Sequence, residues 1–159
     1  MPPPEHAGAE SRPGGVTIHL NGLDNWPALA DARSPILTAA RSALGADPRL
    51  TDGDLSITLV DDDEMERLNV EWLDRTGSTD VIAFSLGSAE SVLGDVYIAP
   101  DTAGKNASGL GVALLEEILR LVIHGTLHVV GYDHPEGPDR SASEMDRVQE
   151  ELLRGLEVR

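Results

Sequence analysis

Residues 124–134 read His-Gly-Thr-Leu-His-Val-Val-Gly-Tyr-Asp-His and hold three of the chain's five histidines. An α-helix would bring His124 and His128 onto one face, one turn apart, where both imidazoles can reach a single metal ion. Gly131 stands where a helix can end in a left-handed turn, and that reversal can bring His134 back as a third ligand. Three neutral nitrogen ligands with an open fourth position are typical of catalytic zinc, because structural zinc is usually closed by four protein ligands.

The same spacing occurs in the zinc helix of the metzincin proteases, H-E-x-x-H-x-x-G-x-x-H. The proteases use the glutamate after the first histidine as general base, and this chain has Gly125 there. We therefore predict a zincin-like metal helix without peptidase chemistry. Core packing is the alternative, but each buried imidazole then needs partners for both ring nitrogens. Zinc is the default ion for an all-imidazole site, although nickel, copper and iron accept the same ligands.

The length and composition indicate one globular domain: 159 residues, 40% of them hydrophobic. The chain has no cysteine, which excludes a disulfide framework and a thiolate metal site. Residues 1–15 are rich in proline, glycine and glutamate and have no apolar stretch, so we expect neither a secretion signal nor a membrane anchor there. We predict a disordered lead-in over 1–15, a single domain over 16–159, and a cytoplasmic protein without membrane contact.

The formal net charge is −16, from 28 acidic and 12 basic side chains. A protein that holds nucleic acid through its phosphates normally has a basic field, so this balance argues against strong nonspecific binding to free RNA or DNA. Contact with nucleic acid would then need a local patch, the metal or a protein partner. An acidic surface also serves solubility, and the two interpretations are compatible.

Periodicity predicts an α+β fold with one mixed four-stranded sheet packed with about five helices. The expected strands are 16–20, 55–60, 80–86 and 94–99. The expected helices are 34–44, 61–72, one after Pro100, 111–130 and one from Ser141. In the second helix, Asp61 and Glu64 resemble a capping box, and Met65, Leu68 and Trp72 form the expected buried stripe. The apolar face of the last helix is expected to comprise Met145, Val148, Leu152 and Leu156.

Three sequence blocks resemble the YbeY family of bacterial endoribonucleases, also described as ribosomal RNA maturation factors. The family hallmark H-G-x-L-H-L-x-G-Y-D-H matches residues 124–134. The family's Leu-Asn pair and its T-D-V-L-S-F-P block match Leu68-Asn69 and residues 79–85, which read T-D-V-I-A-F-S. A Leu-Gly-Asp strand follows at 93–95, and the resemblance covers roughly residues 16–155.

The resemblance implies one zinc ion per chain, held by His124, His128 and His134, and cleavage of single-stranded RNA. The domain over 16–159 is then a metal-dependent endoribonuclease, a hydrolase of RNA phosphodiester bonds. The implied cellular role is maturation of ribosomal RNA, notably at the small-subunit 3′ end, and ribosome quality control. Its expected partners are ribosomal RNA and the ribosome or its small-subunit proteins.

The chain departs from the family pattern in the second block. Family members often have an arginine soon after the Leu-Asn pair, and Leu73 occupies that position here. Arg75 and Asn69 are the candidate RNA-binding residues. The alternatives are an ordinary solvated loop arginine and an asparagine that caps local backbone. Ala83 and Ser85 replace the serine and proline of the family block.

The catalytic base is not fixed by the pattern. Asp133, beside the third histidine, is the nearest candidate, and its alternative role is to accept a histidine N–H. Asp80 and Asp95 are further candidates for either role. The sequence leaves two routes open, attack on phosphorus by metal-activated water or activation of the 2′-hydroxyl by a base. We also hypothesise that Gly125 leaves room for a nucleotide beside the metal.

A second function stays open from a different class, a non-catalytic zinc-containing ribosome assembly factor that acts through protein partners. The acidic composition suits docking onto basic ribosomal proteins. Loss of a zinc ligand would abolish RNA cleavage under the first function and leave ribosome association intact under the second.

Overall fold

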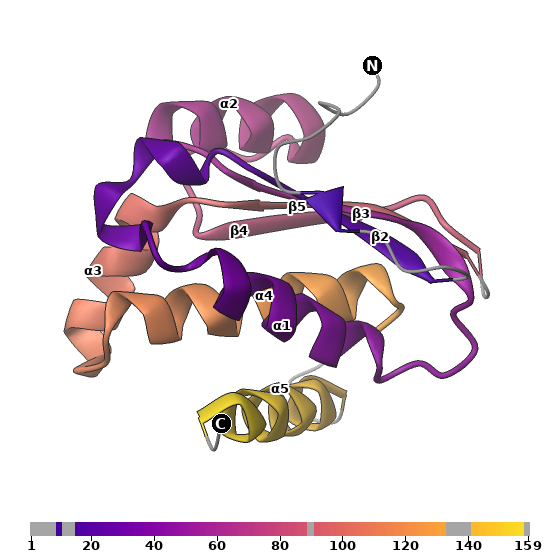
Figure 1. Ribbon diagram of the computed structural model, residues 1–159. Helices are drawn as coiled ribbons and strands as arrows, with labels where there is room; N and C mark the ends of the chain where they lie inside the picture. The colour runs from indigo at the N-terminus through magenta and orange to yellow at the C-terminus, as the bar shows by residue number, and fades with distance from the viewer. Residues whose placement is uncertain (1–8, 11–14, 89–90, 133–140, 158–159) are drawn as a thin grey trace.

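The computed structural model describes residues 9–10, 15–88, 91–132 and 141–157. In chain order its elements are β1 (Ala9–Glu10), β2 (Val16–Asn21), the short 3-10 helices η1 (Leu23–Asn25) and η2 (Pro27–Leu29), α1 (Arg33–Leu44), β3 (Asp52–Leu59), α2 (Asp62–Leu73), β4 (Val81–Ser85), β5 (Ser91–Ile98), α3 (Pro100–Leu110), α4 (Leu114–Val129) and α5 (Ser141–Glu157). Helix α2 covers one face of the sheet, α1 and α4 cover the other, and α5 forms an outer layer against α4 and α1 (Figure 1).

The strand order is β1-β2-β3-β5-β4. Strands β2, β3 and β5 run parallel, and β4 pairs antiparallel with β5. The single domain, its mixed sheet of four main strands and its five helices confirm the predicted fold. The two-residue β1 pairs antiparallel with β2 and extends the sheet at its edge. Neither this strand nor the two 3-10 helices were predicted. The remainder of the predicted lead-in, apart from Gly15, lies outside the described residues.

The main core lies between the sheet and helices α1 and α4. Alternate residues of the strands face it because successive side chains of a strand point to opposite faces. Leu55, Ile57 and Val96 are 0% exposed, as are Ile118 and Ile123 of α4. A smaller cluster beneath α2 comprises Met65, Leu68, Ile82 and Ala99. No helix among the described residues has the length and apolar character needed to cross a membrane.

Helix α2 begins as its sequence predicted, but its last turn is more exposed than predicted. The Asp61 carboxylate accepts a hydrogen bond from the Glu64 backbone N–H at 2.8 Å, which is the expected cap. Trp72 was expected in the buried stripe and is 62% exposed, so that part of the prediction is wrong. Because β4 is the edge strand, Trp72 sets its ring edge-on against Phe84, with 6.1 Å between centroids, and leaves most of its surface to solvent.

Two glycines allow α4 to approach the sheet closely. A Cβ on Gly125 would lie 2.5 Å from Cγ1 of Val96 and 3.4 Å from Cγ2 of Val81. A Cβ on Gly94 of β5 would lie 2.5 Å from Cγ1 of Val129. Gly125 therefore faces the sheet, and valine side chains fill the space beside it. This corrects the hypothesis that Gly125 leaves room for a nucleotide.

We predict that Gly125→Ala destabilises the fold although alanine is the better helix former. The overpacked Cβ should cost about 1–3 kcal/mol, which outweighs a propensity gain of about 1 kcal/mol. Gly104→Ala in α3 is the matched control, since its nearest neighbour, Leu114 Cδ1, would lie at an ordinary 3.8 Å. Denaturant unfolding should show a loss for the first variant and a gain for the control.

The partner side chain provides a second check on this contact. In a Val96→Ala background the two nearest atoms that a Cβ at position 125 would meet are removed, and Cγ2 of Val81 stays at 3.4 Å. The Gly125→Ala change should then lose most of its cost in a double-mutant cycle. Equal costs in both backgrounds would contradict the packing explanation.

Candidate metal centre

Helix α4 places His124 and His128 on one face, as the sequence predicted. Their ring centroids lie 4.8 Å apart with an interplanar angle of 76°, and both residues are partly exposed. The helix geometry alone produces this pairing, because residues four apart are neighbours on the helix surface. The two imidazoles therefore lie side by side on one helix face, as two ligands of one metal ion would.

The end of α4 is a Schellman motif built on Gly131. The Gly131 N–H donates to the His128 carbonyl at 3.1 Å, and the Tyr132 N–H donates to the Leu127 carbonyl at 2.9 Å. Gly131 has φ +111°, which a residue with a side chain rarely adopts. The predicted reversal at this glycine is present, and it turns the chain back immediately before residue 133.

His134 and Asp133 lie outside the described residues. Among the residues that the structure describes, no group of three histidine, cysteine, aspartate or glutamate side chains is arranged to hold a metal ion. The His124–His128 pair nevertheless fits the nitrogen donors that zinc prefers. His134 as third ligand and Asp133 as base or hydrogen-bond acceptor remain predictions.

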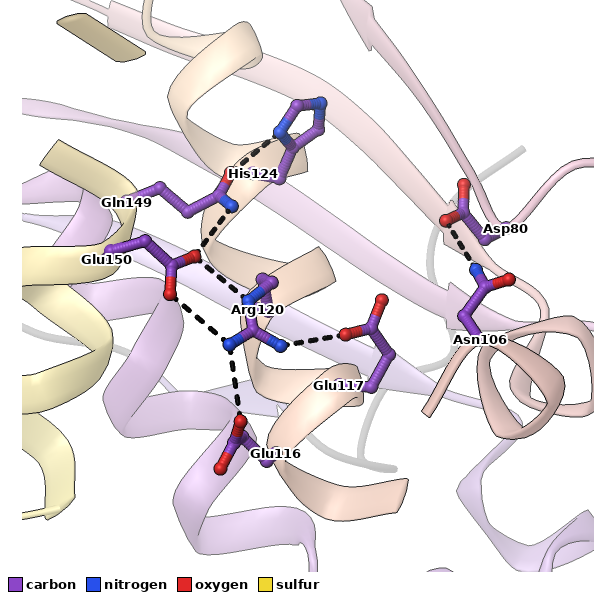
Figure 2. A network of polar contacts seen from close by, with 8 residues as sticks. All are labelled: Asp80, Asn106, Glu116, Glu117, Arg120, His124, Gln149 and Glu150. Carbon is purple, nitrogen blue, oxygen red and sulfur yellow. Dashed lines mark hydrogen bonds and ion pairs between the residues drawn. The ribbon is translucent and has the colours of Figure 1, made fainter. Parts of the chain in front are cut away.

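A polar network joins α4 to α5 beside the histidines (Figure 2). Nδ1 of His124 lies 2.7 Å from Oε1 of Gln149, whose amide nitrogen donates to Oε2 of Glu150 at 3.1 Å. The Gln149 residue is 8% exposed. Gln149 was not among the predicted site residues. It stands four residues after Met145 and four before Leu153, and a polar residue at that position on the apolar face of a helix is a signal of a buried hydrogen bond.

Arg120 anchors this network one turn before His124. Its guanidinium donates to both oxygens of Glu150, at 2.9 and 3.2 Å, and also to Glu117 at 2.8 Å and Glu116 at 3.2 Å (Figure 2). The Arg120 hydrogen bond is the main cause that lowers the pKa of Glu150 below its ordinary value. The same contacts raise the pKa of Arg120, so the Arg120–Glu150 pair stays ionised at neutral pH.

The other two aspartate candidates, Asp80 and Asp95, lie in different places in the structure. The Asp80 carboxylate accepts from Nδ2 of Asn106 at 3.0 Å and so ties the start of β4 to α3 (Figure 2). Asp95 alternates with Gly94 and Val96, which face α4, so it lies on the opposite face of the sheet from the histidines. We therefore assign neither carboxylate to the metal centre.

The loop after α2 gives the two candidate RNA-binding residues different positions. Asn69 is 4% exposed, and its amide donates to the Gly77 carbonyl at 2.9 Å. The backbone carbonyl of Asn69 accepts a hydrogen bond from the Arg75 backbone N–H at 3.2 Å. Asn69 thus orders the loop, which is the structural alternative considered for it, and we do not assign it to RNA. The Arg75 residue is exposed on that loop, and Leu73 is partly buried against the cluster beneath α2.

Ser85, where the family pattern has proline, ties β4 to the end of α4. Its hydroxyl donates to the Val129 carbonyl at 2.9 Å. The last carbonyls of a helix have no partner within the helix, so a side-chain donor stabilises this terminus. This departure from the pattern therefore supports the position of the helix that carries the histidines.

Comparisons with known proteins agree on one family. A family model described as Endoribonuclease YbeY matches residues 18–157. A relative from Azorhizobium caulinodans, named Endoribonuclease YbeY, is 36% identical over 142 residues, covering 85% of this chain and 88% of the relative. One of the same name from Aquifex aeolicus is 42% identical over 101 residues, covering 62% and 65%.

The fold also matches a solved structure. The solution structure of TM1509 from Thermotoga maritima superposes with a TM-score of 0.63 at 26% sequence identity. The match covers 87% of this chain and 88% of that protein. The similarity therefore extends over most of both chains.

We predict that Asp95→Asn stabilises the protein at neutral pH. Burial raises the pKa of Asp95 above its ordinary value of 3.8. The folded state therefore binds the Asp95 proton more tightly than the unfolded state does, and ionisation opposes folding at higher pH. The gain in melting temperature should be present at pH 7 and should shrink as the pH falls through the folded-state pKa toward 3.8. A gain that does not change with pH would contradict this cause.

Proposed function

Because the chain belongs to the endoribonuclease YbeY family, we propose that it is a zinc-dependent endoribonuclease that cleaves single-stranded RNA. Its proposed role is in ribosomal RNA maturation at the small-subunit 3′ end and in ribosome quality control, in the cytoplasm. The match over residues 18–157 supports the family's reaction for this chain. The imidazole pair of His124 and His128 is the observation that carries the metal dependence.

The proposed centre holds one zinc ion through His124, His128 and His134. A zinc ion with three neutral ligands supplies a Lewis acid for phosphoryl oxygens and for water. Helix α4 carries the first two imidazoles on one face, and the Schellman motif at Gly131 reverses the chain after them, which supports a third ligand from the residues that follow. Gly125 cannot be exchanged for a protease-type glutamate without displacing Val96, so the position of the metzincin base faces the sheet in this protein.

Substrate binding must work against a formal net charge of −16. RNA binding through phosphates is favoured by a basic surface, and repulsion between the acidic protein and the RNA phosphates weakens it here. We therefore propose that the ribosome or its basic small-subunit proteins present the RNA, with Arg75 as a local contact to phosphate. The acidic charge is also what favours the second function, a zinc-containing assembly factor that acts through protein partners.

We predict that His128→Ala removes both zinc and cleavage. The loss of affinity should exceed the roughly 10- to 100-fold that follows loss of an outer-shell partner. Elemental analysis should give about one zinc per native chain, and a labelled single-stranded ribosomal RNA fragment reports cleavage. His19→Gln is the matched control. Nε2 of His19, on β2, lies 2.9 Å from Oδ1 of Asp54, on β3, and a glutamine amide can replace that contact.

The outcomes separate the two functions. Loss of zinc and cleavage in His128→Ala alone supports the endoribonuclease. Zinc in the native protein without cleavage, even when ribosomes are added, favours the assembly factor. A native chain that cleaves RNA equally well after removal of all zinc contradicts the proposed metal dependence.

A further inference from the structure

We propose that Gln149 of α5 is a positioning residue for the metal centre. Its side chain holds the proton of His124 on Nδ1 and so presents Nε2 to the metal. The inference rests on the proposed function, since it takes His124 as a zinc ligand. It adds to that function a residue from a different helix, 25 positions further along the chain.

The Glu150 carboxylate can only accept hydrogen bonds when it is ionised. Arg120 donates to both of its oxygens, at 2.9 and 3.2 Å. Arginine is always a donor, so this pair has a single possible polarity. Glu150 therefore presents an acceptor, and not a donor, to its neighbour Gln149.

The polarity of Glu150 fixes the orientation of the Gln149 amide. The amide nitrogen must face Oε2 of Glu150, at 3.1 Å, and the amide oxygen then faces Nδ1 of His124, at 2.7 Å. A carbonyl oxygen only accepts, so Nδ1 of His124 must donate and carry the proton. In the neutral ring the lone pair is then on Nε2, which is the nitrogen that would bind a metal.

Burial makes this contact an effective constraint. Gln149 is 8% exposed, and Met145 and Leu153, one turn away on either side, are 0% and 3% exposed. Water therefore competes poorly for the Gln149 amide, and an amide without its partners in this place would be costly. The contact also fixes the rotation of the His124 ring, as outer-shell partners of metal ligands commonly do.

The neutral character of Gln149 distinguishes it from a carboxylate partner. An amide orients the imidazole without adding negative charge beside the metal. Glu116, Glu117 and Glu150 already surround Arg120 (Figure 2). A neutral acceptor at position 149 therefore avoids a further like-charge contact with Glu150.

The test compares three α5 variants by zinc affinity, measured in competition with a chromophoric chelator. Gln149→Leu places an apolar side chain of similar size between Met145 and Leu153 and removes the acceptor, and it should weaken zinc binding by about 10- to 100-fold. Gln149→Glu restores an acceptor but brings a like charge against Glu150, so it should recover only part of the affinity lost in Gln149→Leu. Glu151→Gln, which changes an exposed acid paired with Arg147, is the matched control and should leave affinity unchanged.

A second readout reports the tautomer directly in metal-free protein. Nitrogen-15 NMR of the His124 ring should show the proton on Nδ1 in the native chain and a mixture of tautomers in Gln149→Leu. Melting temperatures of the metal-free proteins identify any variant that fails to fold, and the native tautomer still tests the inference in that case.

The results separate this inference from the proposed function. Native zinc binding with unchanged affinity and tautomer in Gln149→Leu overturns the role of Gln149 and leaves the zinc enzyme intact. A proton on Nε2 in the native metal-free chain also overturns it. A native chain that binds no zinc overturns the proposed function, and this inference with it.

Discussion

The close approach of α4 to β4 and β5 is the constraint on which the rest of the site depends. Gly125 packs against Val96, and Gly94 packs against Val129, so the helix can take only a narrow range of rotations about its axis. With position 125 directed at the sheet, Arg120 and His124 face α5, and their contacts with Glu150 and Gln149 show it. His128 follows His124 one turn later on the same face. The arrangement of the imidazoles is thus a consequence of backbone packing on the other side of the helix.

The seam between α4 and α5 combines apolar packing with charge. Arg120, whose side chain is 21% exposed, meets three carboxylates, one of them on Glu117 at 6%. Half-buried ion pairs of this kind add little net stability, because desolvation offsets much of the attraction. Their effect here is directional: they fix which atoms donate and which accept between two successive helices. That order is transmitted to His124 through Gln149.

Local signals predicted most of the fold, and contacts between distant elements decided what the sequence missed. The Asp61 cap and the glycine reversal at Gly131 depend on a few neighbouring residues, and both are present. Trp72 was expected to be buried because of its position on the apolar face of the helix. It is exposed because it lies over the edge of the sheet, which the helical pattern does not reveal. The direction of Gly125 and the partner of His124 depend on β5 and α5, so the sequence pattern could identify the histidines and not their surroundings.

The central claim is that three imidazoles from one segment hold a metal ion. X-ray absorption at the zinc edge of the purified native chain tests this most directly. It should show one zinc per chain with three imidazole nitrogens at about 2.0–2.1 Å and one further light-atom ligand. Zinc with only two imidazoles would remove His134 from the centre, and a chain that binds no zinc would contradict the account as a whole.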